Sequence, residues 1–158
     1  SVLARVDADG CVSVATREVN FPNGMVIMPD GKRLLVADSL DQCVYAFALA
    51  ADGTLSQRTC FAALPGEMPD GMCLDASGAV WVALHGRVVR VTEGGAVLED
   101  VDMGRTPARA VGLGGGDGRT LLITASDSYG RSVMAGNPTG RLFTVHVDVP
   151  GAGLPSIY

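Results

Sequence analysis

The sequence has few aromatic and charged residues and no long apolar run. Aromatic residues make up 5% and Asp, Glu, Lys and Arg together 18% of the 158 residues, although 47% are hydrophobic. The 12 Lys and Arg are scattered along the chain, and the formal net charge is −5. Because nucleic acids and anionic membranes attract clustered positive charge, we expect neither as a partner. A membrane-spanning helix needs roughly 20 apolar residues, which no segment supplies.

The four cysteines lack the spacing of a metal or redox motif. Cys11, Cys43, Cys60 and Cys73 form no CxxC pair, and no pair of histidines lies near them. Together with the absence of a secretory signal pattern, this favours reduced, partly buried thiols in a cytoplasmic protein. A disulfide between Cys43 and Cys60 stays open as an alternative.

Glycine is abundant, and short apolar runs lie between the glycines. There are 21 Gly and 8 Pro, and short runs of Val, Leu and Ile between such residues are typical of strands joined by tight turns. No segment keeps the 3.6-residue apolar spacing of an amphipathic helix. The sequence therefore predicts an all-β protein without helices, and residues 126–139, rich in Gly and Ser, as its longest loop.

The chain contains an internal repeat. A Pro-X-Gly-Met block, a turn and an apolar run occur at residues 22–37 and again at residues 69–83, and a weaker copy lies at 110–124. Two more strand-like runs follow each of the first two copies. Four short strands at a period of this size are typical of a β-propeller blade. We therefore predict two complete four-stranded blades.

Partial blades are predicted at both ends of the chain. Residues 3–6 and 11–15 fit the outer strands of a preceding blade, and residues 140–147 fit a third strand of the last one. Residues 1–158 are interpreted as a single domain. Because an incomplete ring exposes apolar blade faces, we expect either a longer protein, of which this chain is a fragment, or self-association through the open blade edges. The start at Ser1, within a predicted strand, favours the first.

Asn23 and Asp70 occupy equivalent positions in the repeat. Each follows Pro, precedes Gly-Met and opens an innermost strand. Because innermost strands line the channel of a propeller, side chains at their starts point toward one mouth of it. Their oxygen donors suit Ca²⁺ or another hard cation. The alternative is that both are ordinary turn dipeptides, as we expect for Asp30-Gly31.

Other polar or aromatic residues are interpreted as structural. Asp38 and Asp75 lie at strand ends, where a carboxylate accepts backbone N–H bonds and ties a loop. Trp81 is expected in the core. His85 could face either the channel mouth or solvent, and a surface or turn position is favoured. His146 is expected on the outward face of a strand. No GxSxG nucleophile motif occurs.

Several spaced blocks together resemble the senescence marker protein/gluconolactonase/luciferin-regenerating enzyme (regucalcin-like) family. They are FPNGM at 21–25, PDGMCLD at 69–75, VWVA at 80–83, RVVRV at 87–91 and GRLF at 140–143. The resemblance covers nearly the whole chain but only the later half of the family pattern. It implies the C-terminal portion of a six-bladed propeller with one divalent cation at its axis. Ca²⁺ is expected first, with Zn²⁺, Mg²⁺ or Mn²⁺ as alternatives.

The resemblance also implies roles for the two repeat positions. Asn23 would be a metal ligand, and Asp70 both a metal ligand and the catalytic acid/base that moves protons between water and the leaving alkoxide. The family's remaining ligands and its substrate contacts belong to the earlier half, so the substrate-binding residues are unknown here.

The expected function is the divalent-metal-dependent hydrolysis of a sugar lactone or related ester, a small-molecule partner, with this chain carrying part of the site. The alternative is a non-catalytic propeller segment that acts as a binding or assembly module. A sibling activity such as strictosidine-synthase-like chemistry is disfavoured by Asn23 and Asp70.

Overall fold

The described part of the chain consists of β-strands, turns and loops. The computed structural model describes residues 1–127, 136 and 139–153, and in them every regular element is a strand, which confirms the all-β prediction. The strands are β1 (Leu3–Val6), β2 (Val12–Thr16), β3 (Pro22–Ile27), β4 (Arg33–Asp38), β5 (Cys43–Leu49), β6 (Leu55–Ala63), β7 (Met72–Leu74), β8 (Val80–Ala83), β9 (His85–Val91), β10 (Val97–Gly114), β11 (Thr120–Ser126) and β12 (Gly140–His146). Most of the predicted long loop at 126–139 lies outside the described residues.

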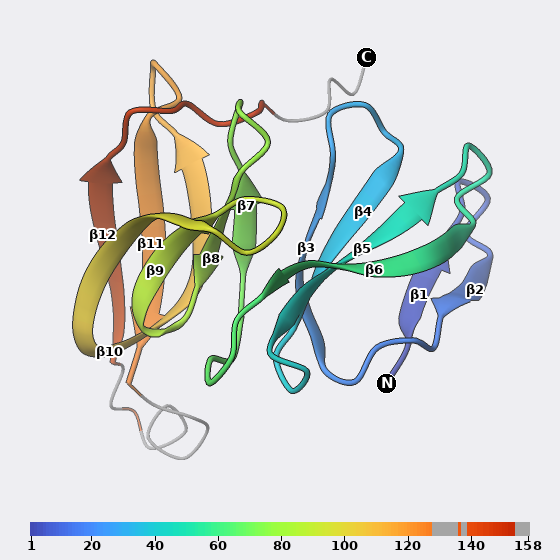
Figure 1. Cartoon of the computed structure of the whole chain (residues 1–158), viewed down its shortest axis with the longest axis horizontal. Coiled ribbons are helices and arrows are strands. Elements are labelled where there is room, and N and C mark those ends of the chain that lie inside the picture. Colours follow the sequence, from blue (N-terminus) through green and yellow to red (C-terminus); the bar gives the residue numbers. More distant parts are fainter. Residues whose placement is uncertain (128–135, 137–138, 154–158) are drawn as a thin grey trace.

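The strands pair in chain order to form three antiparallel sheets. One sheet holds β1 and β2, the next holds β3 to β6, and the third holds β7 to β12 (Figure 1). The first residues of β10 pair with β9, and those from Ala108 to Gly114 pair with β11. The sequence predicted two separate strands here, but the structure makes one strand of 18 residues. It bends where its register shifts between Asp102 and Pro107, next to Gly104 at φ 62°.

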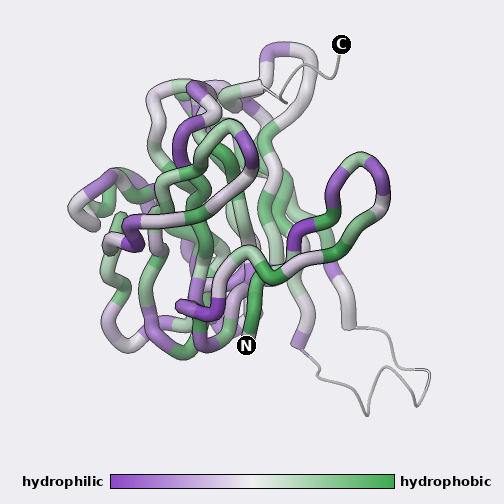
Figure 2. Tube along the Cα trace, turned by 90° about the vertical axis from the view of Figure 1, so that its right-hand side faces the viewer, coloured by the Kyte–Doolittle hydropathy of each residue, from purple (hydrophilic) through white to green (hydrophobic). Residues whose placement is uncertain are grey.

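Two apolar clusters join successive sheets, and one packs strands within the third sheet. The largest lies between β3–β6 and the first strands of the third sheet and contains Phe61 and Val82. A second, around Trp81 and Ile123, joins β8 and β9 to β11. A third joins β1 to the sheet β3–β6. Hydrophobic residues run along the buried strands and hydrophilic ones gather at turns (Figure 2). Trp81 is fully buried, as predicted.

Two buried carboxylates hold strand ends, and both confirm the structural role predicted for them. Asp38 accepts the backbone N–H groups of Asn20 (2.6 Å) and Phe21 (2.8 Å). Asp75 accepts the N–H groups of Ser77 and Ala79 and the Nε–H of Arg90, the last at 2.6 Å. Because each carboxylate is fully buried, these bonds replace those that it would make to water.

The four cysteines are free thiols. Cys11 and Cys60 are exposed, unlike the partly buried thiols that were predicted, whereas Cys43 is buried. The sulfurs of Cys43 and Cys60 lie 2.7 Å apart. Burial, followed by the hydrogen bond with Cys60, raises the pKa of Cys43 to about 12.

In the described ranges no helix is long and apolar enough to cross a membrane.

Replacing Asp75 by alanine should lower the free energy of unfolding by about 2–4 kcal/mol, because buried Arg90 loses its shortest ion pair and keeps only Glu99 as a carboxylate partner, and the N–H groups of Ser77 and Ala79 lose their acceptor. The control is Asp30→Ala, which removes one exposed hydrogen bond to the N–H of Lys32 and should cost about 1 kcal/mol or less. Urea unfolding measures both. Equal losses would show that the buried pair adds nothing to stability.

Cys43 should react with iodoacetamide far more slowly than exposed Cys11 in the folded protein at pH 8. A pKa of about 12 leaves little of the reactive thiolate at that pH, so the rate should rise as the pH approaches 12. Mass spectrometry of the labelled peptides measures the rates, and unfolding in guanidinium should make them similar. Similar rates in the folded protein would contradict the buried, protonated thiol.

Candidate functional site

The first strands of three successive units lie next to one another. They are β3, β7 and the second part of β10, and β3 and β7 stand side by side at the centre of the molecule (Figure 1). The N–H of Gly24 donates to the carbonyl of Asp70 (3.1 Å), and the N–H of Gly71 donates to the carbonyl of Arg109 (2.8 Å). Three residues are therefore structurally equivalent: Asn23 in β3, Asp70 just before β7 and Arg109 at the beginning of the second part of β10.

These two hydrogen bonds require glycine because the backbones approach closely. A Cβ on Gly24 would lie 2.7 Å from the carbonyl oxygen of Asp70, and one on Gly71 would lie 2.7 Å from the Cα of Ala110. Neither glycine has the positive φ of a turn residue, whereas Gly31 has φ 69°. The alternative that Asn23-Gly24 and Asp70-Gly71 are ordinary turn dipeptides is therefore wrong, and Asp30-Gly31 is a turn as predicted.

The residues before these strands are fixed by side chains of β4 and the turn that follows it. Asp38 accepts the N–H of Phe21, two residues before Asn23. The buried hydroxyl of Ser39 donates to the carbonyl of Pro69 at 2.6 Å. The N–H of Asp70 donates to the carbonyl of Ala83 at 2.9 Å. The backbones that carry Asn23 and Asp70 are thus tied to the same turn.

A cavity of about 320 Å³ opens where the three strands begin. It is lined by Phe21, Asn23, Ser39, Met68, Asp70, His85, Ala108 and Arg109. The structure thus brings together both predicted site residues in one cavity. The cavity is large enough for a small sugar-sized ligand, since such sites start at about 300 Å³.

Opposing effects act on the Asp70 carboxyl group. Burial raises its pKa above the ordinary value, because the charged form loses hydration. The positive charge of Arg109, whose Nη1 lies 3.8 Å from Oδ2 of Asp70, opposes the rise. The hydrogen bonds from Asn23 and from the N–H of Gly71 also oppose it. Asp70 is therefore a partly desolvated carboxyl group with donors on several sides.

Sequence reasoning missed Arg109 and left open whether His85 faces the channel mouth or solvent. Arg109 comes directly before Ala110, where the third repeat copy was taken to begin. His85 is exposed at the start of β9, as predicted, but it also lines the cavity. No sequence signal separates such a histidine from one that faces only solvent.

The donor set fits part of a cation site. The oxygens of Asn23 and Asp70 are of the type that Ca²⁺ prefers, but this ion takes about six to eight oxygen ligands. Over residues 1–127, 136 and 139–153, no group of three or more His, Cys, Asp or Glu could hold a metal. Asn23 and Asp70 therefore suit a cation that takes further ligands from elsewhere.

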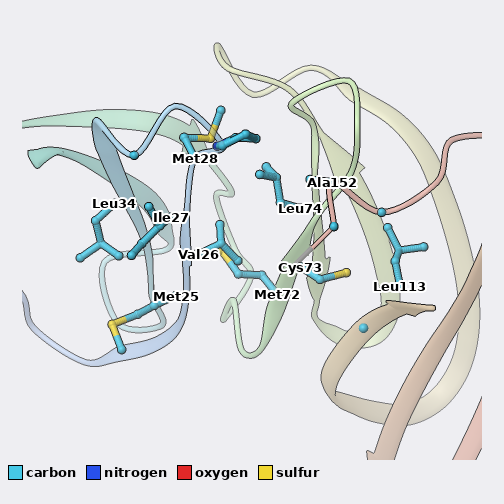
Figure 3. A pocket seen from close by; sticks show the side chains of 15 residues that line it. Met25, Val26, Ile27, Met28, Leu34, Met72, Cys73, Leu74, Leu113 and Ala152 are labelled. Atoms are coloured by element: carbon cyan, nitrogen blue, oxygen red, sulfur yellow. The ribbon is translucent and has the colours of Figure 1, made fainter. Parts of the chain in front are cut away.

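An apolar groove of about 910 Å³ lies farther along the same strands. Figure 3 shows Val26 of β3 next to Met72 of β7, and Met28, just after β3, on the side of Leu74. Met25 points away from β7, and Leu113 of β10 lies beyond β7. The starts of the strands are thus polar and the later parts apolar. This division places the hydrophilic chemistry at one end of the inner strands.

Sequence comparison places this arrangement in a known family. The family model described as the SMP-30/gluconolactonase/LRE-like region matches residues 1–127. The chain belongs to this family. The 6-deoxy-6-sulfogluconolactonase of Pseudomonas putida, an SMP-30/gluconolactonase relative, is 33% identical over 97% of this chain and 55% of its own length. A pentonolactonase of Haloferax volcanii is 30% identical over 97% of this chain and 56% of its own length.

Solved structures of SMP-30/gluconolactonase-type proteins share the fold. A luciferin-regenerating enzyme superposes with a TM-score of 0.79 at 22% identity, covering 95% of this chain and 53% of its own. A calcium-binding protein, regucalcin, from Agrobacterium tumefaciens gives 0.77 at 22% identity with the same coverage. These neighbours are propeller-like. The chain spans about half the length of the relatives that it matches.

Gly71→Ala should destabilise this member of the SMP-30/gluconolactonase family by about 1–3 kcal/mol, because the added methyl group overpacks the contact between β7 and β10. Gly112→Ala is the matched control. Gly112 lies on the inner segment of β10 that Gly71 contacts, and its added Cβ meets nothing within 4 Å. Thermal or urea unfolding compares the two variants. If both variants unfold alike, close strand approach is not the reason for Gly71.

Proposed function

We propose that this chain is the C-terminal portion of a six-bladed propeller that hydrolyses a sugar lactone or related ester at the mouth of its channel. The observation that carries the proposal is the meeting of Asn23 and Asp70, from two separate repeats, in one cavity. Support for the substrate class comes from the relatives, which are named as a sulfogluconolactonase and a pentonolactonase.

A divalent cation, held in part by Asn23 and Asp70, would supply electrophilic assistance to the lactone carbonyl. Ca²⁺ is the first candidate, since one structural neighbour is described as calcium-binding. Zn²⁺, Mg²⁺ and Mn²⁺ remain candidates because both donors are oxygen atoms.

Asp70 is the acid/base residue of the proposed reaction. Its carboxylate takes a proton from the attacking water and returns it to the ring oxygen as that oxygen leaves. Burial raises the pKa of the Asp70 carboxyl group, and a cation held by the same group would oppose that rise. The Asn23 side chain lines the same cavity as this carboxylate, together with the apolar side chains of Phe21 and Met68.

The rest of the site would come from strands outside these 158 residues. The inner strands leave large apolar side chains uncovered: Met25 is 53% and Ile27 48% exposed. Both line the apolar groove, which further inner strands would close in a complete ring. The same strands would bring the remaining cation ligands and the substrate contacts. A cytoplasmic location is also part of the proposal.

Asp70→Asn in the protein with a complete ring should reduce kcat/KM for gluconolactone by about 100-fold or more, the usual contribution of a general acid/base. Asp70→Ala and Asn23→Ala should also weaken divalent-cation binding, measured by calorimetry and by elemental analysis after dialysis. Asp30→Asn, a change in an exposed turn, is the control.

Unchanged cation content and turnover in the Asn23 and Asp70 variants would remove the site assignment. Wild-type protein that retains no cation and hydrolyses no lactone would instead favour the non-catalytic binding or assembly module.

A further inference from the structure

Two cysteines on adjacent strands are in contact at the outer edge of the sheet β3–β6. Cys43 begins β5, and Cys60 lies in β6, the last strand in the order β3–β4–β5–β6. Their Sγ atoms are 2.7 Å apart, which is about 0.7 Å more than the S–S bond of a disulfide. A small movement of the two side chains would therefore bring the sulfurs to bonding distance.

The pairing register of β5 and β6 explains why these side chains meet. Cys43 pairs with Ala63, but Tyr45 pairs with Cys60, because the register shifts between Val44 and Tyr45. Side chains of paired residues lie on the same face of a sheet, and so do those of residues two apart on one strand. Cys43 and Cys60 therefore lie diagonally across from each other on one face.

The two thiols differ in their access to solvent. Cys60 is exposed, whereas Cys43 is buried, with 5% of its surface exposed. The Cys43 thiol also donates a hydrogen bond to the carbonyl of Val44 at 3.3 Å. A reagent in solution can thus reach Cys60, while the fold shields Cys43 from it.

The exposure of Cys60 belongs to the outer surface of the molecule. Both faces of the sheet β3–β6 already pack against described strands, on one side near β1 and on the other near β7 and β8. Inner strands added to close a ring would stand beside β3 at the axis, at the opposite edge of this sheet from β6. The thiol pair therefore does not depend on strands outside the chain.

Cys60 also affects how easily Cys43 ionises. Burial is the first cause that raises the pKa of Cys43 to about 12, and the hydrogen bond with Cys60 and the charge of the Cys60 thiolate are the next two. Both of these contributions disappear when Cys60 is bound in a mixed disulfide. Reaction at Cys60 therefore lowers the pKa of Cys43 and makes its thiolate more available for attack on the neighbouring sulfur.

We propose that Cys43 and Cys60 form a thiol–disulfide exchange site, at which a low-molecular-weight disulfide converts the two thiols into an intrachain disulfide. The Cys60 thiolate attacks the small disulfide, forms a mixed disulfide and releases one small thiol. The Cys43 thiolate then attacks Sγ of Cys60 and releases the second small thiol. Two electrons pass from the protein to the small disulfide, and the two protons of the protein thiols end on the released thiols. The proposal is independent of the proposed lactone hydrolysis.

The test equilibrates the folded protein at pH 8 with mixtures of reduced and oxidised glutathione. Acid quenching, alkylation and mass spectrometry of the digested peptides then give the state of each cysteine. As the share of oxidised glutathione rises, the peptides of Cys43 and Cys60 should become joined with the loss of two hydrogens, in a chain that stays monomeric on a non-reducing gel. The glutathione adduct of Cys60 should remain a minor species.

Three variants test the order of the two steps. Cys43→Ala should accumulate the glutathione adduct at Cys60 about tenfold or more above the wild type, because the fast attack from within the protein is removed. Cys60→Ser should leave Cys43 as an unmodified thiol. Cys11→Ser, which removes another exposed thiol, is the matched control and should form the bridge as the wild type does.

Thermal unfolding gives a second measure of the bridge. It would link residues 17 positions apart and restrict the unfolded chain, so oxidation should raise the Tm of the wild type by about 5 °C or more. Cys60→Ser should show no such rise under the same oxidising conditions.

A wild type that accumulates the Cys60 adduct without bridging would overturn the proposal, and so would bridges that involve Cys11 or Cys73. If Cys43→Ala does not fold, Cys60→Ser decides, since the change lies at an exposed position and must abolish the bridge while Cys43 stays unmodified. Lactone turnover enters none of these measurements, so their failure leaves the proposed function untouched.

Discussion

Two backbone hydrogen bonds between neighbouring inner strands, from Gly24 to Asp70 and from Gly71 to Arg109, set the distance at which the strand starts meet. They form only because neither glycine carries a Cβ. The two contacts bring the side chains of Asn23, Asp70 and Arg109 to the lining of one cavity. Buried Asp38 and Ser39 form hydrogen bonds to the backbone of the residues that precede Asn23 and Asp70. The polar site is thus a product of how closely the sheets pack.

The same packing explains the electrostatics of Asp70. Burial between the strands removes water from the Asp70 carboxyl group and raises its pKa. Neighbouring groups stabilise the charged form and so oppose part of this rise. Arg109 supplies charge, Asn23 a side-chain hydrogen bond and Gly71 a backbone one. Asp75, in contrast, is fully buried and bonded on both oxygens, and it serves the fold.

The sequence predicted the parts of the structure that depend on local pattern. Alternating apolar runs and turns predicted an all-β chain. The 47-residue step from Asn23 to Asp70 predicted that these two residues take equivalent positions and lie together. Arg109 escaped because the third repeat lacks the Pro-X-Gly block, so its start could not be aligned. The continuity of β10 escaped because Gly104 and Pro107 usually break strands. Here they bend a strand whose pairing resumes on the far side.

Strand β10 passes from one set of partners to the next without leaving the sheet, pairing first with β9 and then with β11. The passage between β6 and β7 differs, since residues 64–71 cross there as a loop. A crossover between two related genes within 64–71 would exchange intact hydrogen-bonded units. A crossover near Gly104 would take the two parts of β10 from different parent proteins. The part paired with β9 and the part paired with β11 would then have to join in one strand without a change in pairing register. The unit that recombination can move is therefore the whole sheet from β7 to β12.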